Sequence, residues 1–344
     1  MNVKISLSHP KEWHADSASA GEKSSSVRHV YVSEAEAGTR VDRFLGAQLP
    51  GLPHAFIQRL LRTGQVRVNS GRVQGQARLA VGDDVRLPPV RLEQPKTPLL
   101  PPDGLVRALR GRVLWRDEAL LVLNKTAGVA VHGGSGNRWG VVDGMRRLLQ
   151  EEDSGLQPEL CHRLDKDTSG CLLFALTPVA LRQMADAFRT GSVEKEYLAL
   201  VRGHPQPEEG LIDRPLTRGI VRSGERIVVS AERGLPARTR YRVLRRFDRA
   251  SLVQIHLESG RTHQIRVHFQ AIGHPLAGDR KYGDHAFNLH MERLGLHRLF
   301  LHARQIRFAH PLNGVETTIE APLEEALQRT LLQAESTMPT RPSS

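Results

Sequence analysis

The sequence predicts an α+β protein, with a mixed, mainly antiparallel sheet flanked by helices and a smaller α+β module on its N-terminal side. Between residues 111 and 328, eight strand-like segments outnumber three helical patterns, and the two kinds do not alternate regularly. This order is typical of a mixed or antiparallel sheet and argues against a doubly wound parallel fold. The length of 344 residues suggests about two domains, at roughly 150 residues each.

The composition fits a soluble globular chain. Hydrophobic residues make up 39% of the chain and charged residues 25%, and no apolar run approaches the roughly 18 residues of a membrane helix. The first residues lack the apolar stretch of a secretory signal, and the cysteines are Cys161 and Cys171 alone. Two cysteines exclude a disulfide framework and a four-cysteine zinc site, so we expect a cytoplasmic location.

The chain is strongly basic. Lys and Arg total 49 against 37 Asp and Glu, which gives a formal charge of +12, and 41 of the basic residues are Arg. Because guanidinium binds phosphate in a bidentate way, nucleic acid is one candidate partner. A GC-rich genome would produce the same excess of Arg, so the placement of the charges along the chain is more informative than their total.

The N-terminal part of the chain predicts a tail and a compact module. Residues 1–28 are polar and Ser-rich without hydrophobic periodicity, which indicates disorder. Over residues 29–91, apolar side chains at helical spacing predict short helices near residues 39–49 and 56–62. Asn69, Ser70 and Gly71 predict the turn of a hairpin around residues 66–73.

Positive charge concentrates in this module. Residues 38–91 contain nine Arg and three Asp, a charge of +6, which is half of the excess of the whole chain. The arginines recur on one helix face and flank the hairpin, which favours a binding surface over an ordinary solvated one. With RVDRFL at residues 40–45 and IQRLLRTGQVRVN at residues 57–69, the segment resembles an S4 RNA-binding domain. That resemblance implies phosphate contacts from Arg40, Arg43, Arg59, Arg62, Arg67 and Arg72.

A second, larger domain is expected after a linker. Six prolines between residues 88 and 102 indicate an extended linker, which we place at residues 92–110. The larger domain is expected over residues 111–328, and a flexible tail over residues 329–344. Its predicted helices cover residues 141–150, 178–190 and 262–271. Its strand-like segments begin near residues 113, 119, 170, 195, 227, 239, 251 and 317.

Residues 161–170, CHRLDKDTSG, form the densest group of polar side chains, immediately before an apolar strand. Polar loops at strand ends are frequent functional sites. Asp165 lies close to Arg163 and Lys166, which favours its ionised form, and an ionised carboxylate can act as a nucleophile or a base. The alternative is a charged turn closed by local salt bridges.

Residues 260–268, GRTHQIRVH, place two arginines and two histidines in the first turns of a predicted helix, where an anion can bind. His263 and His268 are five residues apart, so they do not share one helix face, and no cysteine or acidic cluster complements them. No metal site is therefore predicted. Tyr197, in the strand-like segment KEYLALVRG at residues 195–203, is expected either in the core or as a platform on which a base stacks.

Taken in order, these segments resemble the RluA/RluC/RluD family of RNA pseudouridine synthases, and most of all its RluC-type members. The matching segments are LLVLNKTAGVAVHGGSG (120–136), HRLDKDTSG (162–170), KEYLALVRG (195–203), SGRTHQIRVHFQAIGHPLAGDRKYG (259–283) and LFLHARQIRFAHP (299–311). Together with the S4-like module they cover about 300 residues. The chain departs from the family pattern at Thr126, where proline more commonly follows the lysine, and slightly at GDRKYG (278–283).

The resemblance implies a site-specific isomerase that flips uridines out of 23S rRNA, or of a large-subunit precursor, and converts them to pseudouridine. It implies that Asp165 is the catalytic aspartate, that Tyr197 packs on the target base and that Arg261 forms an ion pair with Asp165. Arg163 would fill the gap left by the flipped base. Further contacts with the RNA or the base would come from His162, Thr168, His263, Gln264 and Arg266.

No cofactor is expected, because the isomerisation adds and removes no atoms. A membrane partner is not expected either, and nothing in the sequence demands more than a monomer.

Two other function classes are weighed against this one. A non-catalytic RNA-binding factor for ribosome assembly would have a decayed site, whereas Asp165, Tyr197 and Arg261 are all present. A hydrolase could use Asp165 and Asp167 as an acid–base pair. Glycosidase carboxylates, however, need about 5–9 Å between them across a sugar groove rich in aromatic residues, and only 5% of this chain is aromatic.

Overall fold

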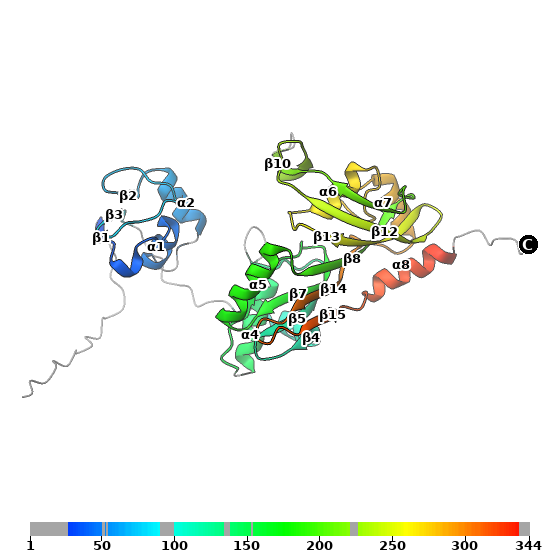
Figure 1. The fold of residues 1–344 in the computed structure, drawn as a ribbon, viewed down its shortest axis with the longest axis horizontal. Coiled ribbons are helices and arrows are strands. Elements are labelled where there is room, and N and C mark those ends of the chain that lie inside the picture. Colours follow the sequence, from blue (N-terminus) through cyan, green and yellow to red (C-terminus); the bar gives the residue numbers. More distant parts are fainter. Residues whose placement is uncertain are drawn as a thin grey trace, which may run out of the picture. The chain divides into compact units, whose positions relative to one another are not determined.

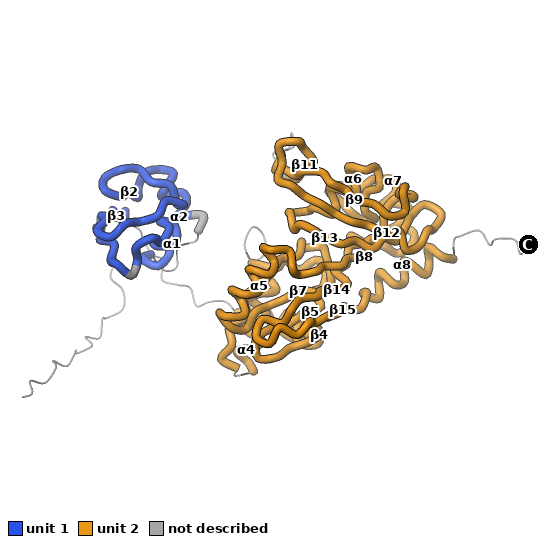
Figure 2. The backbone as a smooth tube through the Cα atoms, viewed as in Figure 1, with its two compact units in different colours: residues 1–99 blue, residues 100–344 orange. Residues whose placement is uncertain are grey.

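The computed structural model describes residues 27–49, 52, 54–89, 100–133, 138–152, 154–220 and 226–336. The chain divides into two compact units, residues 1–99 and 100–344 (Figure 2). Nearly all of the segment predicted to be disordered, and the first part of the predicted linker, lie outside the described residues. The structure begins the larger unit about ten residues earlier than the sequence predicted.

The smaller unit packs two helices on a three-stranded antiparallel sheet with the strand order β1-β3-β2. Its buried core includes Val41, Phe44 and Leu45 from the first helix and Ile57 and Leu60 from the second, as the helical spacing predicted. The elements are β1 (Arg28–Tyr31), a 3-10 helix (Glu34–Glu36), α1 (Val41–Gln48), α2 (His54–Arg62), β2 (Arg67–Val68) and β3 (Asp84–Leu87).

The larger unit is built on a ten-stranded mixed sheet, so the predicted α+β class is confirmed (Figure 1). Its main path runs β4-β5-β7-β14-β8-β13-β12-β9, and β6 and β15 pair with β7 and β14. Among the described strands of this sheet, β7 and β14 form the one parallel pair. The strands are β4 (Val113–Arg116), β5 (Leu120–Lys125), β6 (Glu159–Leu160), β7 (Ser169–Ala175), β8 (Glu194–Arg202), β9 (Glu209–Asp213), β12 (Arg238–Arg246), β13 (Ala250–Leu257), β14 (Leu301–Ala309) and β15 (Glu316–Glu320). A separate hairpin pairs β10 (Leu216–Ile220) with β11 (Arg226–Ser230).

The middle strands β5 and β7 are buried on both faces. Alternate residues belong to different core clusters: Leu172 and Phe174 pack with α4 (Val141–Glu151), whereas Cys171 and Leu173 pack with α5 (Pro178–Thr190). This follows from the two-residue period of a strand. The end of β7 that carries the polar loop is thereby fixed between two layers of helices.

The three predicted helices of this unit are confirmed to within two residues. The bounds of α5 match the prediction because Thr177 caps its first turn by accepting the Ala180 N–H, and Gly191 ends it in the left-handed conformation. The third helix, α6 (Gln264–Ala271), begins two residues later than predicted, since His263 itself adopts a left-handed conformation.

Two predicted boundaries are wrong, and three helices of the larger unit were not predicted. The expected linker contains α3 (Asp103–Arg110), whose Val106 and Leu109 are buried in the main core of the larger unit. The expected tail contains most of α8 (Glu325–Ser336), in which Thr330 and Ala334 are buried. The prolines of residues 88–102 favoured a linker over α3, and the position of α8 near the end of the chain favoured a tail, although both helices have apolar side chains at helical spacing. The third unpredicted helix is α7 (His285–Arg293).

Candidate active site

Asp165 lies in the loop between β6 and β7, where two clefts meet. One cleft, of about 650 Å³, has Phe188 and Tyr197 in its wall. The other, of about 1040 Å³, is lined by many charged side chains, among them Arg280 and Lys281. Both clefts share four residues: Arg163, Asp165, His263 and Arg266. The Asp165 side chain is 18% exposed, so a molecule in either cleft can reach a carboxylate that is already largely desolvated.

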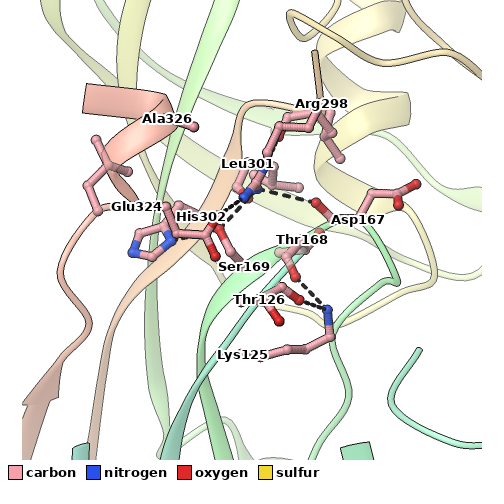
Figure 3. Close-up of polar contacts among 12 residues, drawn as sticks. Lys125, Thr126, Asp167, Thr168, Ser169, Arg298, Leu301, His302, Glu324 and Ala326 are labelled. Atoms are coloured by element: carbon pink, nitrogen blue, oxygen red, sulfur yellow. Dashed lines mark hydrogen bonds and ion pairs between the residues drawn. The ribbon is translucent and has the colours of Figure 1, made fainter. Parts of the chain in front are cut away.

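Lys125, the last residue of β5, holds the backbone of the Asp165 loop in place. This side chain is fully buried, and its Nζ donates to the carbonyl oxygens of Thr126 and Thr168, at 2.8 Å in both cases (Figure 3). The Nζ also donates to the Lys166 carbonyl oxygen at 2.9 Å. Burial lowers the pKa of Lys125 to about 7. Since a buried carbonyl left without a partner costs about 1–3 kcal/mol, Lys125 fixes the backbone on both sides of the turn.

A second anchor joins the loop to β14. Arg298 Nη2 donates to Ser169 Oγ at 3.0 Å and to the Asp167 carbonyl at 3.3 Å (Figure 3). Gly170 has φ +109°, and an added Cβ would lie 2.1 Å from the carbonyl oxygen of Ala303. Only glycine therefore allows the parallel pairing of β7 and β14 that begins at this point.

Two cationic or potentially cationic groups face the Asp165 carboxylate. Arg266 Nη1 lies 3.8 Å and His263 Nε2 lies 4.0 Å from Asp165 Oδ2. Arg266 is itself held by the buried Asp279, which accepts from its Nε and Nη2 at 2.7 and 2.8 Å. This fork-like pair leaves one edge of the guanidinium directed at Asp165.

The expected ion pair between Arg261 and Asp165 is wrong. Arg261 Nε donates to the Pro236 carbonyl at 3.2 Å, and Arg266 takes the place beside Asp165. The reason is the start of α6 at Gln264: Arg261 lies in the turn before the helix, whereas Arg266 lies in its first turn and is buried. Arg261 remains in the wall of the 650 Å³ cleft.

Tyr197 is a core residue, as the first of its two alternatives predicted, and its role as a platform for a base stays a prediction. The residue lies on β8, is 6% exposed and belongs to the main hydrophobic core, yet it also lines the 650 Å³ cleft. Burial, with the charge of Asp165 adding to it, raises the pKa of Tyr197. The ring is thus a neutral, rigid wall for the cleft.

Other residues expected to contact RNA support the site from within. His162 Nε2 accepts the Leu173 N–H at 3.0 Å, its ring stacks on Phe188, and burial lowers its pKa to about 3. Thr168 is 2% exposed. Both ends of the Gln264 amide are occupied by protein partners: its Oε1 accepts from Ser259 Oγ and the Arg261 N–H, and its Nε2 donates to Thr239 Oγ1 and the Arg238 carbonyl. Arg163, in contrast, is exposed at the junction of the clefts.

Sequence reasoning gave no role to Lys125, Asp279, Tyr282 or Arg298. Lys125 carried a usable signal, because it ends an apolar run that predicts a buried strand. Asp279 and Tyr282 lie in the GDRKYG segment. Asp279 pairs with Arg266 on the preceding helix α6, and Tyr282 pairs with His263 directly before that helix. Nothing local distinguishes Arg298 from the many other arginines.

In the smaller unit, most of the arginines predicted to bind RNA are exposed. Arg40 is the exception in part, because it pairs with the buried Asp42 at 2.6 Å. The Arg59 guanidinium lies 4.5 Å from the centre of the Phe56 ring, and Arg67 Nη1 donates to the Ser70 carbonyl at 3.3 Å. The remaining exposed members of the set are Arg43, Arg62 and Arg72.

The described residues offer no metal-binding cluster, disulfide or membrane-spanning helix. They hold no group of three or more His, Cys, Asp or Glu side chains that could bind a metal ion. Burial raises the pKa of the Cys161 and Cys171 thiols to about 12, and both cysteines are free. No helix in the described ranges is both long and apolar enough to cross a membrane.

Comparison with known proteins identifies the family. Residues 119–271 match the family of RNA pseudouridylate synthases. Two curated relatives, from Pasteurella multocida and Escherichia coli K12, are both named ribosomal large subunit pseudouridine synthase C. Each is 46% identical to this chain. The match covers 89% of this chain in both cases, and 93% and 96% of the two relatives, respectively. The chain belongs to the RluA/RluC family of RNA pseudouridine synthases. As a member of this family it is an isomerase, and its resemblance to RluC-type proteins is confirmed.

The fold agrees with this assignment. The solved structure of human RNA pseudouridylate synthase domain containing 4 is 28% identical, with a TM-score of 0.58, and the match covers 67% of this chain and 96% of that one. Human RNA pseudouridylate synthase domain containing 1 is also 28% identical, with a TM-score of 0.53, over 70% and 99%. The mixed sheet is therefore that of the pseudouridine synthase fold.

Proposed function

We propose that this protein converts specific uridines of 23S rRNA to pseudouridine, with Asp165 as the catalytic carboxylate. The relatives named for the large ribosomal subunit support the substrate class. One structural observation carries the proposal. A desolvated carboxylate stands at the junction of an aromatic-walled cleft and a charged cleft, with Arg266 and His263 within 4.0 Å.

The two clefts suit the two parts of a flipped nucleotide. A uracil ring fits the 650 Å³ cleft against Tyr197, while the flanking phosphates meet the charged cleft near Arg163, Arg280 and Lys281. Extruding a base from folded RNA costs a few kcal/mol. Phosphate contacts that release counterions offset this cost, and they make binding dependent on salt.

The chemistry requires the N1–C1′ bond to break and a C5–C1′ bond to form. The uracil then loses its C5 proton and gains one at N1, so no atom is added overall. Asp165 either attacks C1′ or removes the 2′ proton. In each route negative charge develops on the detached uracil, and preorganised donors beside Asp165 stabilise it.

The smaller unit serves as an S4-like RNA-binding module in this proposal. Its exposed arginines would contact phosphates of structured rRNA and so hold the target near the clefts. The enzyme acts as a monomer in the cytoplasm, on free 23S rRNA or on a large-subunit precursor.

The test is a pseudouridine map of 23S rRNA from a strain that lacks the protein, made by carbodiimide treatment and primer extension. We expect stops to disappear at discrete uridines and to return with the wild-type protein but not with Asp165→Asn. An unchanged 23S map would refute 23S rRNA as the substrate. If the 16S and tRNA maps were also unchanged, the result would point to a non-catalytic role.

The module has a separate test. Arg59→Gln with Arg62→Gln should weaken binding of the full chain to folded rRNA and lower the slope of log K against log salt by about 1 per lost phosphate contact. Arg242→Gln is the matched control, because this arginine is already paired with Glu209 on the sheet. An equal effect in the control would remove the module's assigned role.

A further inference from the structure

His263 is held in an unusual position beside Asp165. It is a non-glycine residue in the left-handed conformation, with φ +56°, directly before α6. Its Nδ1 lies 2.8 Å from the Tyr282 hydroxyl, and its Nε2 lies 4.0 Å from Asp165 Oδ2. Sparsely populated backbone conformations persist where the surroundings fix them, and they cluster at functional sites.

The partners of Tyr282 decide where the imidazole proton lies. The Tyr282 hydroxyl accepts the N–H of Val228 on β11 at 2.9 Å, and the ring is 4% exposed. A hydroxyl has one proton to donate, and among the described residues its other partner is His263 Nδ1. If the phenol donates to Nδ1, both groups are satisfied. If Nδ1 carried the proton, the buried phenol proton would lack an acceptor, which is costly.

The electrostatic surroundings keep His263 neutral. Burial lowers the pKa of His263, and the charges of Arg266 and Lys281 lower it further, against the opposing effect of Asp165 and Asp279. Burial also raises the pKa of Tyr282, so the phenol keeps the proton that it donates. The Arg266 guanidinium lies over the Tyr282 ring, 4.9 Å from its centre, which restricts the ring further.

We propose that His263 is a catalytic hydrogen-bond donor, fixed as the Nε2–H tautomer by Tyr282 and directed at an oxygen of the flipped uridine beside Asp165. The proposal rests on the proposed catalytic role of Asp165. His263 lines both clefts, so its Nε2–H is accessible from the side on which the nucleotide enters. Tyr282 is then a positioning residue that acts through His263, and Val228 ties it to the β10–β11 hairpin.

The tautomer can be measured without reference to activity. Full-length protein labelled with ¹⁵N-histidine would be studied by long-range ¹H–¹⁵N correlation near neutral pH, with His263→Gln used to assign the resonance. We expect His263 to show a protonated Nε2 and an unprotonated Nδ1. An Nδ1–H tautomer or an imidazolium in the wild type would overturn the proposal, even if the enzyme isomerises uridine as proposed.

Tyr282→Phe tests the positioning role in the same spectra. Losing the phenol proton should leave His263 as a mixture of tautomers, and kcat on an rRNA transcript should fall roughly ten-fold or more with KM little changed. Tyr241→Phe is the matched control, because it removes another buried tyrosine hydroxyl of the same unit, one that donates to the Pro207 carbonyl at 3.0 Å. An unchanged His263 signal in Tyr282→Phe would refute the role of Tyr282.

Variants of His263 separate donation from packing. Gln can place an N–H near the position of Nε2, whereas Asn reaches only to the position of Nδ1. We therefore expect His263→Gln to keep more activity than His263→Asn, with His263→Ala reduced on the order of 10²-fold. Equal activity in all three, at equal thermal stability, would show that His263 donates nothing to the reaction.

Discussion

The substitution Asp279→Asn should expose how much the site depends on a buried ion pair. The carboxylate of Asp279 accepts four hydrogen bonds: two from the Arg266 guanidinium at 2.7 and 2.8 Å, and two from the backbone N–H groups of Lys281 and Tyr282 at 2.9 and 3.0 Å. Asparagine can keep the backbone bonds. Its amide N–H would then face the Arg266 N–H, and a buried guanidinium would lose its counter-charge.

The expected loss follows from the burial of the pair. The Asp279 and Arg266 side chains are 0% and 8% exposed, and breaking such a pair costs about 3–5 kcal/mol in the free energy of unfolding. Asp165, 3.8 Å from Arg266, would take over part of the pairing, so we expect a value near the lower end, about 3 kcal/mol. For a unit of this size that corresponds to a fall in melting temperature of roughly 6–12 °C.

The assay is urea unfolding followed by tryptophan fluorescence, since Trp115 and Trp139 lie in the larger unit. The matched control is Asp213→Asn, whose ion pair with Arg238 is about half exposed on both sides, with an expected loss of about 0–1 kcal/mol. If Asp279→Asn lost no more than this control, the inference that Asp279 holds Arg266 in place would be refuted.

The pH dependence provides an independent check. Burial alone would raise the pKa of Asp279, but its hydrogen bonds with Arg266 and the charge of that residue outweigh burial and hold the pKa below its ordinary value. A carboxylate whose pKa is lower in the folded state stabilises the fold above its unfolded pKa, and this contribution is lost as the pH falls through the folded value. The stability difference between wild type and Asp279→Asn should therefore stay constant from neutral pH down to about pH 5, and shrink below about pH 4.

Three further outcomes are expected. Asp165→Asn should abolish turnover and leave the affinity for rRNA within about three-fold of wild type, as measured by filter binding; parallel loss of binding would contradict a chemical role. Arg266→Gln should lower kcat on the order of 10²-fold, whereas Arg261→Gln should change it much less. Single-turnover kinetics that ranked the two variants in the opposite order would contradict the conclusion that Arg266, and not Arg261, assists Asp165. Gly170→Ala should unfold the larger unit or lower its free energy of unfolding by more than about 4 kcal/mol, because the added Cβ would overlap the neighbouring strand. The control is Gly155→Ala, at φ +62°, where no atom lies within 4 Å of the added Cβ. It should lose only about 1–2 kcal/mol in thermal denaturation.

Part of the fold could be read from the chain alone. The helices over residues 141–151 and 178–190 were predictable because their apolar spacing and their caps are local properties. The helices over residues 103–110 and 325–336 were not, since their apolar faces are short and become meaningful only once partners cover them. The choice of mixed sheet over parallel sheet was accessible from the order of the segments.

The site divides in the same way. The sequence by itself determined three parts of the site, because each lies in a dense local motif. They are the polar loop that carries Asp165, the segment at the start of a helix that carries Arg266, and the strand that carries Tyr197. These are properties of neighbours along the chain, which residue type and spacing express directly.

Only the tertiary structure decided which arginine faces Asp165. Arg261 and Arg266 are five residues apart and chemically identical, so their order in the motif cannot rank them. The start of α6 and the buried Asp279 select Arg266. Lys125 likewise takes its role from carbonyl groups that belong in part to a loop about 40 residues further along the chain. Hydrogen bonds of this kind depend on distance and direction in space, and a sequence records neither until the sheet has brought its strands together.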